Sequence, residues 1–243
     1  MKTQLFTAVA ASLLLASAAP AWSASAAQAL PAPKIDVATT AAGKLETAVL
    51  AGGCFWGVQG VFQHVKGVKM VYSGYSGGLG ATAHYELVGT GTTGHAESVQ
   101  IVFDPAQISF GEVLRIFFTV ATDPTQVNMQ YPDEGPQYRN EIFYTTPDQK
   151  RVAEAYIQQL NDAHVFKKPI ATRVDPMKGF FKAEDYHQDY LTLHPNQSYI
   201  ATFDIPKVNM LRAAFPERYT ATPVLVFPSN QAKIRPAKAA KAS

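Results

Sequence analysis

The chain has almost no cysteine, since Cys54 is the only one in 243 residues. A single cysteine excludes an intramolecular disulfide, so its thiol is either free or paired with another molecule. The sequence also lacks a C-x-x-C pair, and its six histidines never form an H-x-x-x-H pair, so the common zinc motifs are absent. We therefore expect no bound metal.

Other absences narrow the function further. No G-x-G-x-x-G run leads from a predicted strand into a helix, so nothing indicates a dinucleotide cofactor. The formal net charge of +2 includes five cations at position 2 and within 233–241, which leaves −3 for the rest of the chain. Such a body offers no basic surface for nucleic acid. With 47% hydrophobic and 16% charged residues, the chain is globular and long enough for one full core.

Residues 1–26 have the pattern of a secretory signal peptide, with Lys2, an apolar run from Leu5 to about Ala19, and small residues near the predicted cleavage site. The apolar run is short for a membrane span. We expect an exported protein, in the bacterial periplasm or secreted, with no stable membrane insertion after cleavage. A free thiol is easily oxidised in such compartments, which favours a use for Cys54 over an inert buried cysteine.

Composition divides the remaining chain into three parts. Residues 27–45 are rich in Ala, Pro and Thr and are predicted to be a linker. Residues 46–228 form the predicted catalytic domain, with a coil-rich C-terminal extension. Residues 229–243 are rich in Ala and Lys and contain no aromatic residue, so we expect a disordered basic tail.

Hydrophobic periodicity predicts an alternation of short strands and helices within the domain. Helix starts are marked by Ser109 with Glu112 and by Thr146 followed by Pro147. The predicted strands lie at about 47–51, 68–72, 99–103, 141–145 and 170–174, and a short helix is expected at 183–191. Two long irregular segments, 73–98 and 122–140, are predicted to be ordered site loops. The fold class is therefore α+β, a mixed sheet with packed helices, with a ferredoxin-like core and long irregular site loops.

Cys54 lies where the first predicted strand passes into the first helix, directly after Gly52 and Gly53. A thiol in the first turn of a helix faces unpaired N–H groups and the positive end of the helix dipole. Both favour the thiolate, so Cys54 is a candidate nucleophile. Phe55 and Trp56 follow it, and these rings belong either to an apolar pocket beside the sulfur or to the core.

Several polar residues could assist such a nucleophile. Glu97 would donate a proton if enclosure raised its pKa, although a lone glutamate is more often solvated. Tyr85 and Tyr138 lie in the two irregular segments, and each phenol can donate a hydrogen bond. His95 could be the base of a Cys–His pair or a loop hydrogen-bonding residue. Asp133 lies in a turn-like "PDEG", for which a local backbone hydrogen bond is the default explanation.

Six short motifs together resemble the A-type peptide methionine sulfoxide reductases, which are specific for the S epimer. These motifs are "GCFWG", "GYSGG", "HYELV", "GHAE", "QYR" and "EDYHQDYL", and they occur in the family's order and spacing. The resemblance extends from about Glu46 to Ile200, nearly the whole predicted domain.

The resemblance implies a role for each matching residue. Cys54 would attack the sulfoxide sulfur, and Glu97 would deliver a proton to the oxygen, which Tyr85 and Tyr138 would hold. The oxygen would remain on Cys54 as a sulfenic acid, the first step of cysteine oxidation, while methionine is released.

The remaining matches concern the walls of the pocket. Phe55 and Trp56 would enclose the methyl group of the substrate, and Asp133 would help to order the site. The chain departs from the family pattern at Tyr131, where a smaller residue is usual, and at Asn140, where a serine is usual.

Many family members carry a second cysteine that resolves the sulfenic acid, and this chain has none. The resemblance therefore implies an external thiol reductant, a thioredoxin-like protein or a small thiol, and no other cofactor. Its partners would be oxidised proteins and this reductant, and a monomer is the default. Two other classes stay open: a cysteine hydrolase or acyltransferase that pairs Cys54 with His95 or His187, and a binding module without catalysis.

Overall fold

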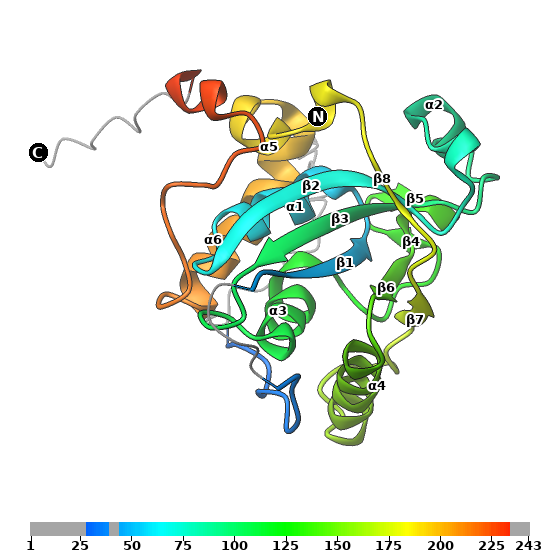
Figure 1. Cartoon of the computed structure of the whole chain (residues 1–243), viewed down its shortest axis with the longest axis vertical. Coiled ribbons are helices and arrows are strands. Elements are labelled where there is room, and N and C mark those ends of the chain that lie inside the picture. The colour runs from blue at the N-terminus through cyan, green and yellow to red at the C-terminus, as the bar shows by residue number, and fades with distance from the viewer. Residues whose placement is uncertain (1–27, 39–43, 234–243) are drawn as a thin grey trace, which may run out of the picture.

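The structure is a computed structural model that describes residues 28–38 and 44–233. Its strands are β1 Glu46–Gly52, β2 Val68–Ser76, β3 Ala96–Phe103, β4 Met129–Gln130, β5 Asp133–Glu134, β6 Asn140–Tyr144, β7 Arg173–Pro176 and β8 Phe180–Lys182. Its α-helices are α1 Phe55–Gln63, α2 Tyr85–Val88, α3 Phe110–Ile116, α4 Pro147–Asp162, α5 Tyr190–Leu193 and α6 Ile205–Ala214 (Figure 1).

Six of these strands form one sheet in the order β7-β6-β1-β3-β2-β8, and β4 and β5 form a separate hairpin. The four central strands lie in the order β6-β1-β3-β2, and all neighbours among them are antiparallel. Along the chain, these strands and two helices follow one another as β1, α1, β2, β3, α3 and β6. This is the ferredoxin-like arrangement. β7 adds a parallel strand beside β6, so the sheet is mixed. The predicted α+β fold is confirmed.

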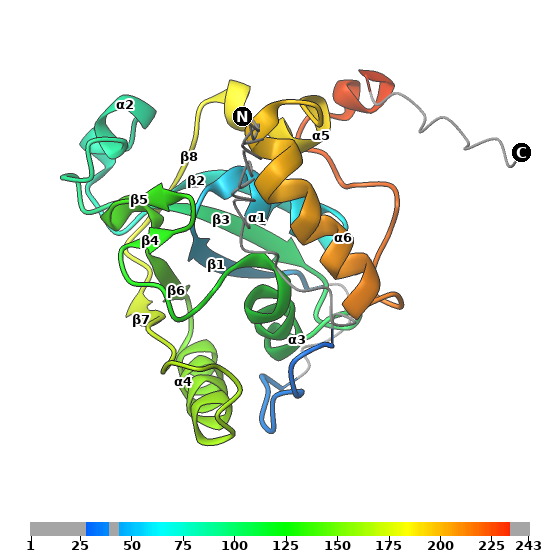
Figure 2. The same ribbon diagram turned by 180° about the vertical axis from the view of Figure 1, so that it is seen from behind.

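The main core lies between the sheet and the helices that cover one of its faces. Figure 2 shows α1 and α3 in front of the sheet, with α6 lying over α1. Leu50 and Ile101 of the sheet and Phe62 of α1 are fully buried there. A small second cluster around Val49 and Phe143 occupies the opposite face and is covered in part by the segment that leads into β8.

The predicted helix starts are present in the structure. The side chain of Ser109 accepts a hydrogen bond from the backbone N–H of Glu112 at the start of α3. Thr146 caps α4 in the same way through the N–H of Gln149, and Pro147 occupies the first helical position. These caps satisfy N–H groups that have no partner within the helix.

Several local predictions were incomplete. β2 and β3 extend farther than expected, so that Tyr75 pairs with Glu97 inside the sheet. The predicted helix at 183–191 is interrupted by Asp189, whose φ of 60° is left-handed, and α5 begins only after it. The extension expected to be coil-rich contains α6, whose buried residues include Leu211.

The segments on either side of the domain pack against it. In the segment predicted to be a linker, the carbonyl of Leu30 accepts a hydrogen bond from Arg115 at 2.6 Å. At the other end, the first residues of the predicted disordered tail continue a short 3₁₀ helix over Pro228–Lys233, and the buried side chain of Asn230 donates to Asp189. The predicted signal peptide and the last ten residues lie outside the described part, and the domain boundaries stay predictions.

The strand register gathers four chain segments at one end of the sheet. Gly52, at the end of β1, pairs with Asn140, at the start of β6. β3 begins at the same end because it is antiparallel to β1, and there Glu97 pairs with Tyr75 of β2. Cys54, Glu97 and the residues that precede β6 therefore meet beside the first turn of α1. In the described part of the chain, no helix is both long and apolar enough to cross a membrane.

Candidate active site

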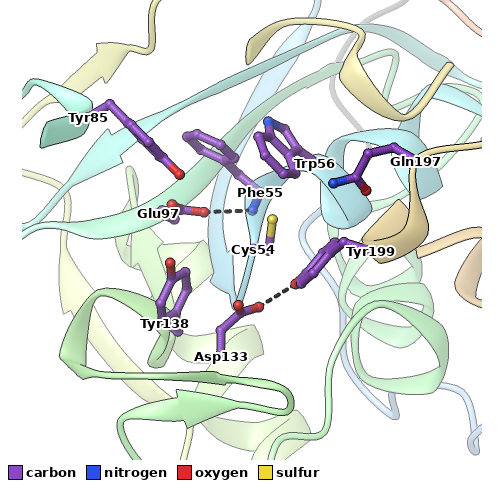
Figure 3. Close-up of a pocket in the computed structure, with 9 residues that line it drawn as sticks. All are labelled: Cys54, Phe55, Trp56, Tyr85, Glu97, Asp133, Tyr138, Gln197 and Tyr199. Atoms are coloured by element: carbon purple, nitrogen blue, oxygen red, sulfur yellow. Dashed lines mark hydrogen bonds between the residues drawn. The ribbon is translucent and has the colours of Figure 1, made fainter. Parts of the chain in front are cut away.

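A small pocket of about 150 Å³ lies at this end of the sheet. Figure 3 shows the sulfur of Cys54 near its centre, with side chains from several segments around it. The pocket brings together the seven residues to which the family resemblance gives a role and adds two that the sequence did not indicate: Cys54, Phe55, Trp56, Tyr85, Glu97, Asp133, Tyr138, Gln197 and Tyr199.

Backbone geometry places Cys54 at the N-terminus of α1. It is the N-cap residue of the helix, and it follows Gly53, which has a φ of +90° that side chains rarely adopt. A Cβ atom on Gly53 would also lie only 2.5 Å from the side chain of Gln130. The glycine therefore permits the sharp turn that brings the chain from β1 into the pocket.

The expected thiolate is not the resting state of this cysteine. Burial raises the pKa of the Cys54 thiol well above its ordinary value, and the carboxyl groups of Glu97 and Asp204 raise it further. The N–H of Trp56 acts in the opposite direction but is outweighed. The helix-dipole argument was thus wrong about the net effect, because the sequence did not reveal the enclosure or the acidic neighbours.

Glu97 has the environment of a proton donor. Its side chain is 4% exposed, and its Oε2 accepts a hydrogen bond from the backbone N–H of Phe55 at 3.0 Å. Burial raises its pKa to about 8, while the hydrogen bond from Phe55 opposes the shift. The carboxyl group is therefore mostly protonated at neutral pH and lies next to the residue that follows Cys54.

Two tyrosines bring further hydroxyl groups into the pocket. Tyr85 begins α2, and its backbone N–H donates to Glu184 at 3.1 Å, which fixes that end of the helix. Tyr138 ends the 3₁₀ turn that precedes β6. Burial raises the pKa of Tyr85 to about 12 and that of Tyr138 still higher, so both phenols remain neutral donors.

The two rings after Cys54 have different surroundings. Phe55 is 1% exposed and belongs to the core as well as to the pocket wall. Trp56 is half-buried and stacks on Tyr190 with a centroid distance of 4.0 Å and an interplanar angle of 11°. Its indole N–H donates to Nδ1 of His187 at 3.2 Å. These contacts hold the Trp56 ring as a fixed apolar wall.

The C-terminal extension supplies the part of the pocket that the sequence did not predict. Tyr199 donates its hydroxyl hydrogen to Asp133, and its ring lies edge-on to Trp56 at 6.2 Å. Burial raises the pKa of Asp133, and the hydrogen bond from Tyr199 and the charge of Lys207 oppose that shift. Tyr199 carries no local signal in the sequence that would mark it as a pocket residue, because only the folded chain brings its hydroxyl to Asp133.

Neither histidine of the hydrolase hypothesis is placed as a base for Cys54. His95 accepts the N–H of Gly78 through Nδ1, and its Nε2 lies 3.0 Å from the carbonyl of Leu79. His187 accepts from Trp56, and burial lowers its pKa to about 4. The geometry therefore gives the hydrolase hypothesis no support. Among the described residues, no group of three or more His, Cys, Asp or Glu side chains could hold a metal ion.

A buried thiol beside a protonated carboxyl group and two neutral phenols is suited to a polarised S=O bond, whose oxygen needs proton donors while its sulfur is attacked. The fold and this pocket define an oxidoreductase, and comparison with known proteins gives its family.

The model of the family "Peptide methionine sulfoxide reductase" matches residues 46–219. The chain is 53% identical over 185 residues to peptide methionine sulfoxide reductase MsrA 2 of Mesorhizobium japonicum, which covers 76% of this chain and 95% of the relative. It is 51% identical over 195 residues to MsrA 2 of a Synechocystis strain, and the match covers 79% of this chain and 91% of that relative. The chain belongs to the A-type peptide methionine sulfoxide reductases, and it is a peptide-methionine (S)-S-oxide reductase.

Solved structures agree with this assignment. Methionine sulfoxide reductase A of Corynebacterium diphtheriae has a TM-score of 0.53 and 32% identity, covering 70% of this chain and 84% of that one. Mxr1 from Saccharomyces cerevisiae, in its reduced form, has a TM-score of 0.57 and 30% identity, and the match covers 63% of this chain and 88% of that one.

Proposed function

We propose that the chain reduces protein-bound methionine S-sulfoxide through the thiol of Cys54. The observation that supports this most strongly is the shared pocket of Cys54 and Glu97, in which a carboxyl group with a pKa of about 8 lies beside the only thiol of the chain. A nucleophile and a proton donor are thus available together at neutral pH.

The first half of the reaction moves one oxygen atom. The sulfur of Cys54 attacks the sulfoxide sulfur as Glu97 donates its proton to the sulfoxide oxygen. The proton that the thiol gives up passes to Glu97, which returns to its protonated form. Tyr85 and Tyr138 donate hydrogen bonds to that oxygen. The S–O bond then breaks, methionine leaves with its sulfur reduced by two electrons, and Cys54 holds the oxygen as a sulfenic acid.

The pocket walls orient the substrate for this attack. The fixed Trp56 ring and the buried Phe55 ring form an apolar wall for the methyl group of the sulfoxide. The hydroxyl and carboxyl donors on Tyr85, Tyr138 and Glu97 receive the oxygen. With the methyl on the wall and the oxygen on the donors, the rest of the methionine must leave through the mouth of the pocket. These three fixed directions are met by one configuration at the sulfur, which accounts for a preference between epimers.

The second half needs a thiol from outside the chain. Cys54 is the only cysteine, so no intramolecular disulfide can form. An external thiol condenses with the sulfenic acid to a mixed disulfide and water, and a second thiol releases Cys54 and forms an external disulfide. We propose a thioredoxin-like protein or a small thiol as this reductant.

The site of action follows from the N-terminal sequence. Residues 1–26 carry the pattern of a secretory signal peptide, so we propose that the enzyme acts after export, in the bacterial periplasm or outside the cell. Its role there is the repair of oxidised methionine in exported proteins, which restores a flexible apolar side chain.

The two epimers of a dabsylated methionine sulfoxide test this proposal. With dithiothreitol, the mature protein should reduce the S epimer alone, and Cys54→Ser should abolish turnover. Without a reductant, dimedone should trap a sulfenic acid on Cys54 after one turnover. Reduction of both epimers at equal rates, or activity that persists in Cys54→Ser, would contradict the mechanism.

A further inference from the structure

Tyr131 is an exposed aromatic residue whose ring the mechanism does not use. It is a large ring, and 63% of its surface is exposed. It lies in the turn between β4 and β5, and its backbone N–H donates to the side chain of Gln126 at 2.8 Å. Tyrosine is one of the residue types most often found among those that carry the binding energy of an interface.

Aromatic contacts connect this ring to the pocket. Tyr131 lies edge-on to Phe203, with ring centroids 5.9 Å apart. Phe203 lies 5.2 Å from Tyr199, and Tyr199 lies 6.2 Å from Trp56 inside the pocket. Phe203, the middle ring between Tyr131 and Tyr199, is half-buried. The apolar surface of the pocket thus continues outward through two further rings.

The size of the pocket leaves most of a polypeptide substrate outside. A volume of about 150 Å³ is well below the roughly 300 Å³ at which pockets for whole small molecules begin, so it has room for one side chain. The residues on either side of the sulfoxide must lie across the mouth.

Tyr131 is close enough to meet these neighbouring residues. It precedes the pocket residue Asp133 by two positions, and two residues of chain span at most about 7 Å. The same span along an extended substrate separates the sulfoxide from the second residue on either side. The outer rings therefore lie within reach of the residues that flank the sulfoxide in a bound polypeptide.

We propose that Tyr131 and Phe203 form an aromatic shelf that binds an apolar side chain one or two positions from the methionine sulfoxide in a polypeptide. The occupant is apolar because the shelf offers ring faces that continue the apolar wall of the pocket. This inference rests on the proposed function and specifies its substrate class: sulfoxides in hydrophobic stretches of chain, which oxidised proteins expose when they lose structure.

The test compares three substrates that differ only beside the sulfoxide. Two are short peptides with the S-sulfoxide flanked by leucine or by serine, and the third is N-acetyl methionine S-sulfoxide methylamide, which has no flanking side chain. Specificity is the ratio of kcat/KM for the leucine peptide to kcat/KM for the small amide, measured with dithiothreitol. Tyr131→Ser removes the ring, and Tyr131→Phe keeps it.

Leu45→Ser is the matched control. Leu45 is also an exposed apolar residue, at 49%, but it precedes β1 at the end of the strand remote from Cys54. Circular dichroism checks that each variant is folded.

The shelf predicts that Tyr131→Ser lowers this ratio about three- to tenfold. The loss should appear in KM, since the shelf binds the ground state and the transition state equally. Tyr131→Phe and Leu45→Ser should keep the ratio of the unaltered chain, and the serine peptide should show little response. An unchanged ratio in Tyr131→Ser would overturn the shelf.

Two other results are distinguishable from this failure. If Tyr131→Ser slows only turnover with a protein reductant, the surface binds the reductant, and the proposed occupant is wrong. If the unaltered chain fails to reduce even the small amide, the proposed function itself is refuted, and the shelf with it.

Discussion

Replacement of Glu97 by glutamine gives the sharpest prediction about the chemistry. Glutamine keeps the shape of the side chain and removes its titrating proton. General acid catalysis contributes about 10²- to 10⁴-fold to enzymatic rates. Because Glu97 is the proposed proton donor to the sulfoxide oxygen, we expect Glu97→Gln to lower kcat/KM for the S-sulfoxide within that range at neutral pH.

The pH dependence carries the quantitative test. With a pKa of about 8 for Glu97, the carboxyl group is mostly protonated near about pH 7 and mostly charged near about pH 9. The rate of the unaltered enzyme divided by that of Glu97→Gln should therefore fall about tenfold between these two values. Because the charge of Glu97 also raises the pKa of the Cys54 thiol, the thiol is titrated in both proteins, and each rate is divided by the ionised fraction of Cys54 before the ratio is taken.

The assay is reduction of methionine S-sulfoxide at a saturating concentration of dithiothreitol over this pH range. Glu134→Gln is the matched control, because Glu134 is an exposed glutamate on the neighbouring hairpin. Its profile should superimpose on that of the unaltered enzyme. A ratio that stays constant with pH, or a Glu97→Gln variant that retains full activity, would refute the role of Glu97 as the acid.

Three further predictions concern stability and the pocket wall. Glu97→Gln should be increasingly more heat-stable than the unaltered chain as pH rises from about 5 to about 8, because the folded state holds the Glu97 proton after the unfolded state has lost it; calorimetry showing a constant difference would contradict this. Tyr199→Phe should lower kcat/KM several-fold by removing the hydroxyl that orients Asp133. Steady-state kinetics measure this loss, and an unchanged kcat/KM would contradict the role of the hydroxyl. Ser109→Ala should lower the free energy of unfolding by about 1 kcal/mol without changing activity, as measured by urea denaturation.

Local signals in the sequence were sufficient for much of the fold. Ser109 and Thr146 could be recognised as helix caps because a cap depends on residues three positions apart. The placement of Cys54 after two glycines similarly indicated a strand that turns into a helix. The ends of β2 and β3 could not be located, because Tyr75 and Glu97 are held in the sheet by each other across a long loop.

The candidate site was predictable in its members and less so in its electrostatics. The strand-to-helix position indicated Cys54, the motif resemblance gave Glu97 its role, and the structure places both in one pocket. The raised pKa of the Cys54 thiol could not be predicted, because it depends on burial and on Asp204, a residue 150 positions away in the sequence. Tyr199 was missed for a similar reason, since only the folded chain brings it to Asp133.

The destination of the sulfoxide oxygen tests the central claim most directly. Methionine S-sulfoxide labelled with a heavy oxygen isotope is mixed with the reduced mature protein for one turnover, without any added thiol reductant. The protein is then analysed by mass spectrometry. The account predicts one labelled oxygen on the peptide that contains Cys54, in an amount equal to the methionine formed. Methionine released while Cys54 remains unlabelled would contradict direct transfer of oxygen to the thiol.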